Sequence, residues 1–306
     1  MRNKFFITLF LCCGILASAQ EVQVSSGKVQ RFENFKSAYV ATRNVDVWLP
    51  HDYDATKKYA VVYMHDGQML FDATTTWNKQ EWQVDEVAER LQTEKKTQPF
   101  IVVGIASLHL IRHSDLFPQK PFESLPKKTQ DSLYTLERNK SQALFGAKIN
   151  SDNYLKFIVT ELKPFIDKTF STKTDRAHTF IMGSSMGGLI SMYAICEYPD
   201  IFGGAACIST HWPGTFAAEN NPIPGAFYEY LKAKLPNPKN HKIYFDYGDQ
   251  TLDALYPPLQ QKVDKIITAK GFSTKNWLTQ FFPGKDHSEK AWAERLHIPF
   301  EFLLKL

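Results

Sequence analysis

The pentapeptide GSSMG at residues 183–187 constrains this chain more than any other stretch. It follows an apolar run at 178–182 that predicts a short buried strand, and it opens residues 186–197, which contain no proline and predict a helix. A serine at the centre of so tight a turn is forced into strained backbone angles, and the flanking glycines avoid a clash. The turn would expose the hydroxyl of Ser185 at the end of a strand. It therefore predicts a nucleophile whose oxyanion meets the backbone N–H of Met186, while Ser184 points into packing.

Strand and helix patterns alternate along the rest of the chain. Residues 21–50 alternate apolar and polar side chains and predict two or three antiparallel strands. Beyond them, short apolar runs typical of strands buried on both faces alternate with amphipathic segments. This order predicts a mostly parallel central sheet with antiparallel N-terminal strands and helices on both faces. The expected strands are 59–64, 100–105, 178–182, 202–208, 242–247 and 276–282, and the expected helices are 80–93, 152–168, 186–197, 225–235, 258–270 and 287–304.

A long polar stretch at residues 107–150 interrupts this alternation. It holds three prolines and mixed charge, and it is too long for a plain connection, so it predicts a lid-like insertion that covers a cleft and selects the substrate. We expect no second domain, and residues 20–306 would form a single unit that contains this insertion. Several aromatic side chains fall in predicted loops, where they could line a binding cleft; they are Trp77, Trp82, Phe117, Phe122 and Trp212.

The first 19 residues predict a signal peptide. Two basic residues precede an apolar run at 5–16, and Ala17-Ser18-Ala19 fits a cleavage site that leaves Gln20 as the first mature residue. The apolar run is too short to span a membrane. We therefore expect export to the periplasm or the exterior without stable membrane insertion. The net charge of +4 includes no basic block, so nucleic acid is not an expected partner, and the oligomeric state stays open.

The cysteine and histidine patterns give no sign of a metal site. Cys196 falls at the end of the helix after the serine and Cys207 on the next strand, so both are expected to be buried free thiols rather than a disulfide. The nine histidines are scattered without ligand spacing. We expect no metal and no organic cofactor.

A serine nucleophile requires a base and an acid that orients the base. His287 follows the predicted strand 276–282, at the sheet edge where Ser185 is expected. The acid should follow strand 242–247, and two residues there qualify. Asp249 comes directly after a glycine and could serve the turn itself, so Asp253 is the favoured acid. Within the strand lies a third carboxylate, Asp246, which should point away from the loop. The chain order serine, aspartate, histidine is that of α/β-hydrolases.

Other residues are expected to line the cleft. The sequence HDGQ follows the predicted strand 59–64, where an α/β-hydrolase offers a second oxyanion N–H, here from Gly67 or Gln68. The predicted contacts with substrate are Asp66, Arg112, His211 and Trp212. Arg112 could anchor an anionic or polyhydroxyl group, and an ion pair at the surface explains it equally well.

Three motifs resemble a known family. They are YMHDGQ at 63–68, MGSSMGG at 182–188 and GKDHSEKAW at 284–292, within a resemblance that covers nearly all of residues 40–305. They look like the family called "Putative esterase", which includes esterase D, enterochelin-type siderophore esterases, feruloyl and acetyl-xylan esterases, and mycolyltransferases. The resemblance implies an α/β-hydrolase fold with Ser185 as nucleophile, His287 as base, and an oxyanion hole from Met186 and the 66–68 loop.

The resemblance also implies the reaction class. We expect a secreted serine esterase that acts through an acyl-serine intermediate on a small-molecule or oligosaccharide ester, either carbohydrate-linked (acetyl or feruloyl) or of the siderophore type. An acyltransferase would use the same residues and differ only in the acceptor. A catalytically silent binding protein on a hydrolase scaffold would lack a triad member, and none is missing from this sequence.

Overall fold

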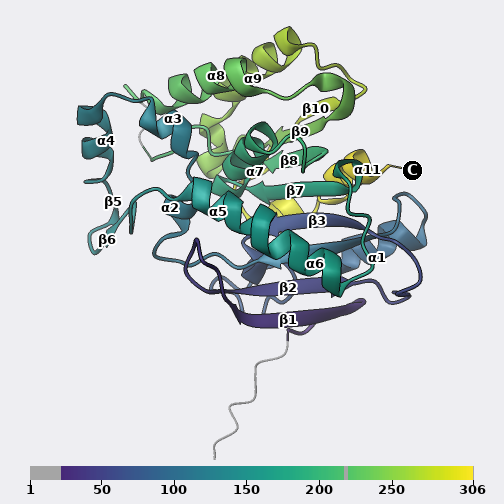
Figure 1. Cartoon of the computed structure of the whole chain (residues 1–306). Coiled ribbons are helices and arrows are strands. Elements are labelled where there is room, and N and C mark those ends of the chain that lie inside the picture. Colours follow the sequence, from purple (N-terminus) through teal and green to yellow (C-terminus); the bar gives the residue numbers. More distant parts are fainter. Residues whose placement is uncertain (1–21, 217–219, 306) are drawn as a thin grey trace, which may run out of the picture.

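Eight strands form one sheet with helices on both faces in the computed structural model, which describes residues 22–216 and 220–305 (Figure 1). The strand order is β1-β2-β4-β3-β7-β8-β9-β10. The β1–β2 and β2–β4 pairs are antiparallel, and all other neighbours are parallel. The strands are β1 (Lys28–Phe35), β2 (Arg43–Leu49), β3 (Ala60–His65), β4 (Phe100–Ile105), β7 (Thr179–Ser184), β8 (Gly204–Ile208), β9 (Lys242–Tyr247) and β10 (Trp277–Phe281).

The central strands are apolar because both of their faces are covered. Every residue of β3, β4, β7 and β8 is buried, whereas the edge strands β1 and β10 are partly exposed along their length. An ion pair between Arg31 and Asp46, at 2.7 Å, joins the two antiparallel N-terminal strands. The predicted mostly parallel sheet with an antiparallel beginning is confirmed. The predicted signal peptide lies outside the described residues.

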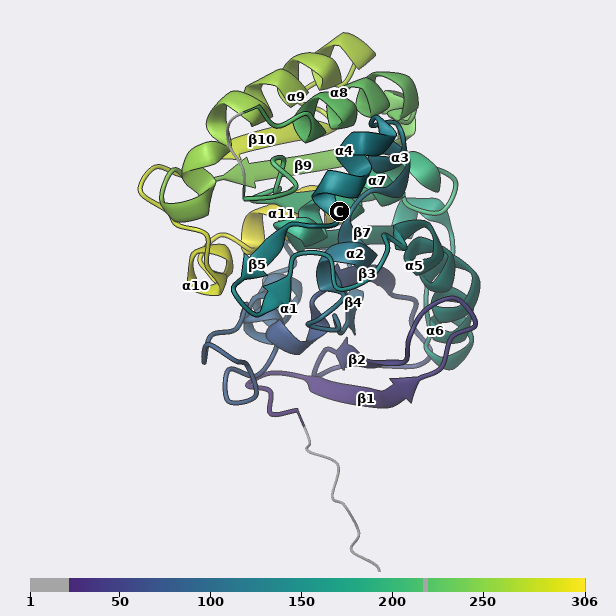
Figure 2. The same cartoon turned by 90° about the vertical axis from the view of Figure 1, so that its left-hand side faces the viewer.

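The helices divide between the two faces of the sheet, as Figures 1 and 2 show. One apolar core lies beneath the larger set, and a second core lies beneath the smaller set. The larger set is α5 (Ser151–Phe157), η2 (Ile158–Leu162), α6 (Lys163–Thr169), α7 (Met186–Glu197), α8 (Ile223–Lys234) and α9 (Pro257–Lys270); the smaller is α1 (Val84–Thr93), α10 (Glu289–Ala293) and α11 (His297–Leu304).

Two of the expected helices are interrupted. The segment predicted as one helix over 152–168 contains a wide π-turn, η2, directly before Pro164, which has no N–H to donate to the preceding turn. The segment predicted as one helix over 287–304 is two helices. Pro299 could not sit inside a continuous helix, and it falls instead in the first turn of α11. Ser288 caps α10 by accepting from the N–H of Ala291, so His287 lies in the loop before the helix.

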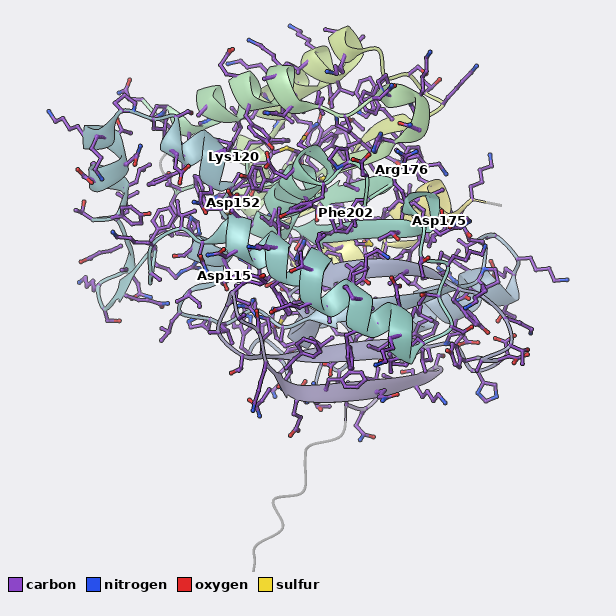
Figure 3. All side chains as sticks on the ribbon, viewed as in Figure 1. Asp115, Lys120, Asp152, Asp175, Arg176 and Phe202 are labelled. Carbon is purple, nitrogen blue, oxygen red and sulfur yellow. The ribbon has the colours of Figure 1, made fainter. Side chains whose placement is uncertain are left out.

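The insertion at 107–150 is folded rather than extended. Its short helices pack against the start of α5, where Figure 3 labels Asp115, Lys120 and Asp152. The carboxylate of Asp115 pairs with Arg43 at 2.9 Å, and the backbone N–H of Gln119 donates to the Ser151 hydroxyl at 3.0 Å. Its elements are α2 (Arg112–Leu116), α3 (Gln119–Glu123), α4 (Lys127–Leu133) and the hairpin β5 (Glu137–Asn139) with β6 (Gln142–Ala143).

The cysteines are buried, and both are free thiols, as predicted. Burial raises the pKa of Cys196 and that of Cys207 above the usual thiol range, so both are held as thiols. Across the described parts of the chain, we find no helix that combines the length and the apolar character needed to cross a membrane.

A carboxylate cluster beside the N-terminal segment makes the fold sensitive to pH. Burial, and then the nearby Glu86, raise the pKa of Glu81 from 4.5 and that of Asp85 from 3.8, each to about 7. The folded state therefore holds protons between about pH 4 and pH 7 that the unfolded state has released, so stability falls as pH rises through this window. We expect a Tm about 2–4 °C lower at pH 8 than at pH 5.5.

Thermal unfolding of variants would assign this effect to the cluster. Glu86→Gln should flatten the pH dependence, because it removes the charge that acts on both neighbours. Asp52→Asn, an exposed carboxylate outside the cluster, is the matched control and should leave the dependence unchanged. A Tm that rises from pH 5.5 to pH 8 in the unmodified protein would contradict the prediction.

Candidate active site

The turn around Ser185 has the strained geometry that its sequence predicts. Ser185 joins β7 to α7 with φ 57° and ψ −118°, which is a costly conformation for a residue with a side chain. A Cβ on Gly183 would lie 3.0 Å from the backbone of Gly187, so a side chain there would push the strand and the helix apart. The strain is maintained by packing on both sides. The result is a serine at the first turn of a buried helix, beside the carboxyl ends of the parallel strands.

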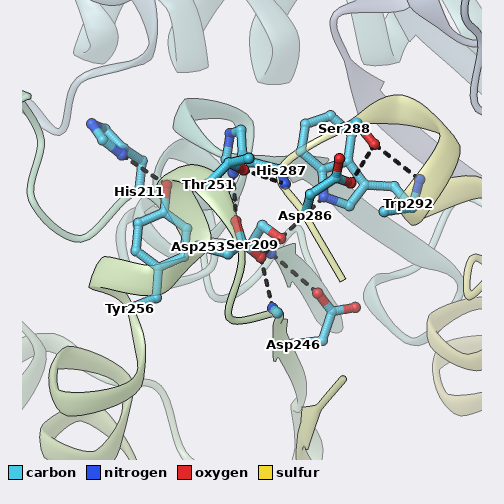
Figure 4. Close-up of polar contacts among 12 residues, drawn as sticks. Ser209, His211, Asp246, Thr251, Asp253, Tyr256, Asp286, His287, Ser288 and Trp292 are labelled. Carbon is cyan, nitrogen blue, oxygen red and sulfur yellow. Dashed lines mark hydrogen bonds and ion pairs between the residues drawn. The ribbon is translucent and has the colours of Figure 1, made fainter. Parts of the chain in front are cut away.

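The imidazole of His287 faces the carboxylate of Asp253. The distance from His287 Nδ1 to Asp253 Oδ1 is 2.6 Å, and Asp253 is fully buried (Figure 4). Burial alone would raise the pKa of Asp253, but the contact with His287 and hydrogen bonds from the Ser209 hydroxyl and the Gly248 N–H hold it below its usual value. A buried carboxylate of this kind stays ionised and fixes the orientation of the ring.

The loops that carry the acid and the histidine are fastened together through backbone contacts. The N–H groups of Asp249 and Gln250 both donate to the carbonyl of Lys285 at 3.1 Å. A Cβ on Gly248 would lie 2.0 Å from that same carbonyl, so only glycine permits this approach. The Asp249 carboxylate accepts from the N–H of Gly284 at 2.7 Å. Asp249 therefore braces the two loops, and Asp253 is the carboxylate that contacts the histidine.

A buried polar network lies behind Asp253, and the sequence gave no sign of it. The Ser209 hydroxyl donates to Asp253 at 2.6 Å and accepts from the indole of Trp292 at 3.0 Å and from Arg295 at 2.9 Å (Figure 4). Arg295 is only 2% exposed and also pairs with Asp246 at 3.0 Å. The carboxylate of Asp246 thus serves the network. A buried cation stabilises the charge on both carboxylates.

A second buried pair adjoins the serine. The phenol of Tyr256 lies 2.9 Å from Nδ1 of His211, and it also interacts with the Ser185 hydroxyl. Burial holds the pKa of His211 well below its usual value, so the ring is neutral. Burial likewise raises the pKa of Tyr256, so the phenol stays protonated. Sequence reasoning found His211 but missed Tyr256, because no local pattern marks a tyrosine that a later loop turns toward the serine.

The backbone groups expected to bind an oxyanion lie on one side of the cavity. Met186 is the first residue of α7, where helix N–H groups have no intrahelical partner. Gly67 and Gln68 open the short helix η1 (Gly67–Met69) after Asp66, which has a left-handed φ of 58°. A Cβ on Gly67 would lie 2.5 Å from the backbone of Gly104. Packing against β4 is thus one demand for glycine at this position.

The side chains of Asp66 and Arg112 form a bidentate ion pair. Both contacts measure 2.6 Å, from Arg112 Nε and Nη2 to the two carboxylate oxygens. Burial would raise the pKa of Asp66, but Arg112 holds it below its usual value. Of the two roles that the sequence left open for Arg112, the structure shows an ion pair, placed in the wall of a cavity rather than on the open surface.

A cavity of about 1000 Å³ contains these groups. Trp77, Trp82 and Trp292 line one part of it, and the insertion contributes Ser107, His109, Arg112, His113 and Arg138. The other lining residues that matter here are Asp66, Gln68, Ser185, Met186, His211 and His287. Within residues 22–216 and 220–305, no three His, Cys, Asp or Glu side chains are grouped so that they could hold a metal ion.

Three aromatic residues predicted to line the cleft lie elsewhere. Trp212 is fully buried, and its indole donates to Gln260 at 2.7 Å. Phe117 and Phe122 belong to the apolar core beneath the insertion. These predictions were wrong because a loop position was taken to mean exposure, whereas the packing of α8 and α9 covers Trp212. Trp77, which is 84% exposed, and Trp82 do line the cavity.

Comparisons with known proteins agree with this geometry. A family model described as "Putative esterase" matches residues 38–114 and 124–298. An uncharacterized protein of Bacillus subtilis, YbbA, is 22% identical over 268 residues, which cover 85% of this chain and 92% of that protein. The endo-1,4-beta-xylanase/feruloyl esterase of Xylanibacter ruminicola is 24% identical over 94% of this chain, which spans only 33% of that longer protein.

A solved structure shares the fold. A ferulic acid esterase from Anaeromyces mucronatus, determined in complex with ferulic acid, superposes with a TM-score of 0.62 at 17% identity. The similarity covers 95% of each chain. Agreement over nearly the whole length at so low an identity shows that the fold is that of an α/β-hydrolase.

Proposed function

Because the chain belongs to this esterase family and is a serine carboxylic-ester hydrolase, we propose that Ser185, His287 and Asp253 form its catalytic triad. The observation that carries the proposal is the 2.6 Å contact between His287 and the buried Asp253, in a cavity that also contains Ser185. The nucleophile, the base and the orienting acid then come from three loops at one edge of the sheet, as the chemistry requires.

The proposed reaction passes through an acyl-serine. His287 Nε2 takes the proton of Ser185 as its Oγ attacks the ester carbonyl carbon. The tetrahedral oxyanion is stabilised by the N–H of Met186 and by an N–H from Gly67 or Gln68. The same imidazole then gives its proton to the leaving alcohol. Water, deprotonated by His287, attacks the acyl-serine and releases the acid.

The charges around the triad favour the imidazolium that forms in each step. Asp253 accepts from His287 and stays ionised, so it balances the new positive charge. Ser209 and Arg295 act as positioning residues, because they hold the second oxygen of Asp253 and the neighbouring Asp246. The acid therefore keeps one orientation throughout the cycle.

We propose that the substrate joins an aromatic or acetyl acid to a sugar. The support is the tryptophan-lined part of the cavity, together with two similar proteins whose names specify feruloyl or ferulic acid esterase activity. Aromatic walls suit a planar acyl group or a sugar ring. A siderophore-type ester is the alternative. In this proposal the protein is exported by residues 1–19, and the insertion at 107–150 acts as a lid.

An active-site label tests the proposed nucleophile. A fluorophosphonate should add one label per chain, on the peptide that contains Ser185, and prior incubation with a hydrolysed ester should slow labelling. Methyl ferulate, an acetylated sugar and a siderophore-type ester would then rank the substrate classes. A folded protein that is labelled at Ser184, or not labelled at all, would refute the triad.

A further inference from the structure

Arg138 is a cation in the cavity that the proposed reaction does not use. It lies on β5 of the insertion, is half-buried, and lines the same cavity as Ser185 and His287. Its guanidinium lies over the ring of Phe216, with 5.9 Å from Cζ to the ring centroid. Contact with an aromatic face leaves the N–H groups in the guanidinium plane free to donate.

The other charges of the cavity are already balanced. The fork of Arg112 is held by both oxygens of Asp66. Glu289 accepts from the amide of Asn78 at 2.8 Å. Among the described residues, by contrast, no carboxylate pairs with Arg138. Burial and then the nearby charge of Arg112 both lower the pKa of Arg138, with no acidic group opposing them.

An unpaired guanidinium in such a place is costly. Partial burial removes water from the charge, and repulsion from a second cation adds to the cost. An oxyanion bound in the cavity would repay both terms, because arginine binds carboxylates through two parallel N–H···O bonds. The position of Arg138 therefore fits an anion that arrives with the substrate.

We infer that Arg138 forms an anion subsite, and that the ester substrate carries a carboxylate or a similar oxyanion on its acyl or its alcohol half. This inference rests on the proposed function and deepens it, because it names a charge that the substrate class must carry. It places the specificity of the cavity on the hairpin of the insertion rather than on Arg112.

Two pairs of esters test the inference, each pair differing only in charge. For the acyl half, the probes are methyl 4-carboxycinnamate and its 4-carbamoyl counterpart. For the alcohol half, they are the acetates of 4-(hydroxymethyl)benzoate and 4-(hydroxymethyl)benzamide. A carboxylate and a primary amide have nearly the same shape, so the ratio of kcat/KM within a pair reports the charge alone. We expect a preference of about tenfold for the carboxylate in one pair, the size of one charged hydrogen-bond contact.

Variants locate the preference on the hairpin. Arg138→Gln should bring the ratio close to one, and Arg138→Lys should restore part of it as a point charge without the fork. Lys140→Gln removes the same charge from an exposed position two residues away and should leave the ratio unchanged. The preference should also fall with added salt, because the subsite is partly open to solvent. Ratios near one in both pairs of the unmodified protein, or a preference that survives Arg138→Gln, would overturn the inference.

Binding measurements separate this inference from the proposed function. Calorimetry of the four esters with a Ser185→Ala variant reads the subsite without turnover. Charge-dependent binding in a protein that hydrolyses none of the esters would refute the proposed function and keep the subsite. Turnover without any charge preference, in binding or in kcat/KM, would refute the subsite and keep the proposed function.

Discussion

Replacing Ser185 with alanine is expected to lower kcat for the best ester on the order of 10⁶-fold, the scale seen when a serine nucleophile is removed. No other hydroxyl occupies the strained turn, where Ser185 has φ 57° and begins a buried helix. Alanine and serine pay a similar cost for this backbone conformation, so the variant should remain folded. Initial rates measured at saturating substrate, together with the Tm, give the result.

The neighbouring serine provides the matched control for this measurement. Ser184 is the last residue of β7 and is 4% exposed, so Ser184→Ala makes the same chemical change one residue away. Its effect on kcat should be small. A Ser185→Ala variant that keeps more than about a tenth of the activity while folded would show that another group attacks the ester.

The change Asp253→Asn is expected to lower kcat about 10³–10⁴-fold. An asparagine side chain of the same shape would present an N–H to His287 Nδ1 and favour the tautomer whose Nε2 carries the proton. That tautomer cannot take the proton of Ser185. The second oxygen position would still accept from Gly248 and Ser209, so the loop should stay in place.

The comparison with Asp249→Asn separates two neighbouring carboxylates. Asp249 accepts from the N–H of Gly284 and makes no contact with the imidazole, so this variant should cost less than about tenfold in kcat. Both variants should be compared at equal foldedness, checked by circular dichroism. If Asp249→Asn proved the more damaging of the two, the catalytic acid would have to be reassigned to Asp249.

Local sequence patterns were enough for the architecture of the sheet. An apolar run reports a strand buried on both faces, and a helix of period 3.6 reports the face that packs, because both signals depend only on near neighbours. The turn at Ser185 is a feature of the same kind, since glycines two positions away on each side act within one strand-to-helix connection. Gly183 and Ser185 could therefore be placed correctly before any tertiary contact was known.

Tertiary structure decided the features that depend on residues far apart in the chain. The position of Asp253 against His287 required two loops to meet, and the pairing of Asp66 with Arg112 required the insertion to fold back over η1. Burial of Trp212 depended on α8 and α9, and no local pattern reports whether a loop will be covered. Groups that act at a distance escape sequence reasoning for the same physical reason; they are Ser209, Arg295, Tyr256 and Arg138, whose charge or hydrogen bond is defined only by partners 40 or more residues away, by a cavity that many segments share, or by an unpaired position within it.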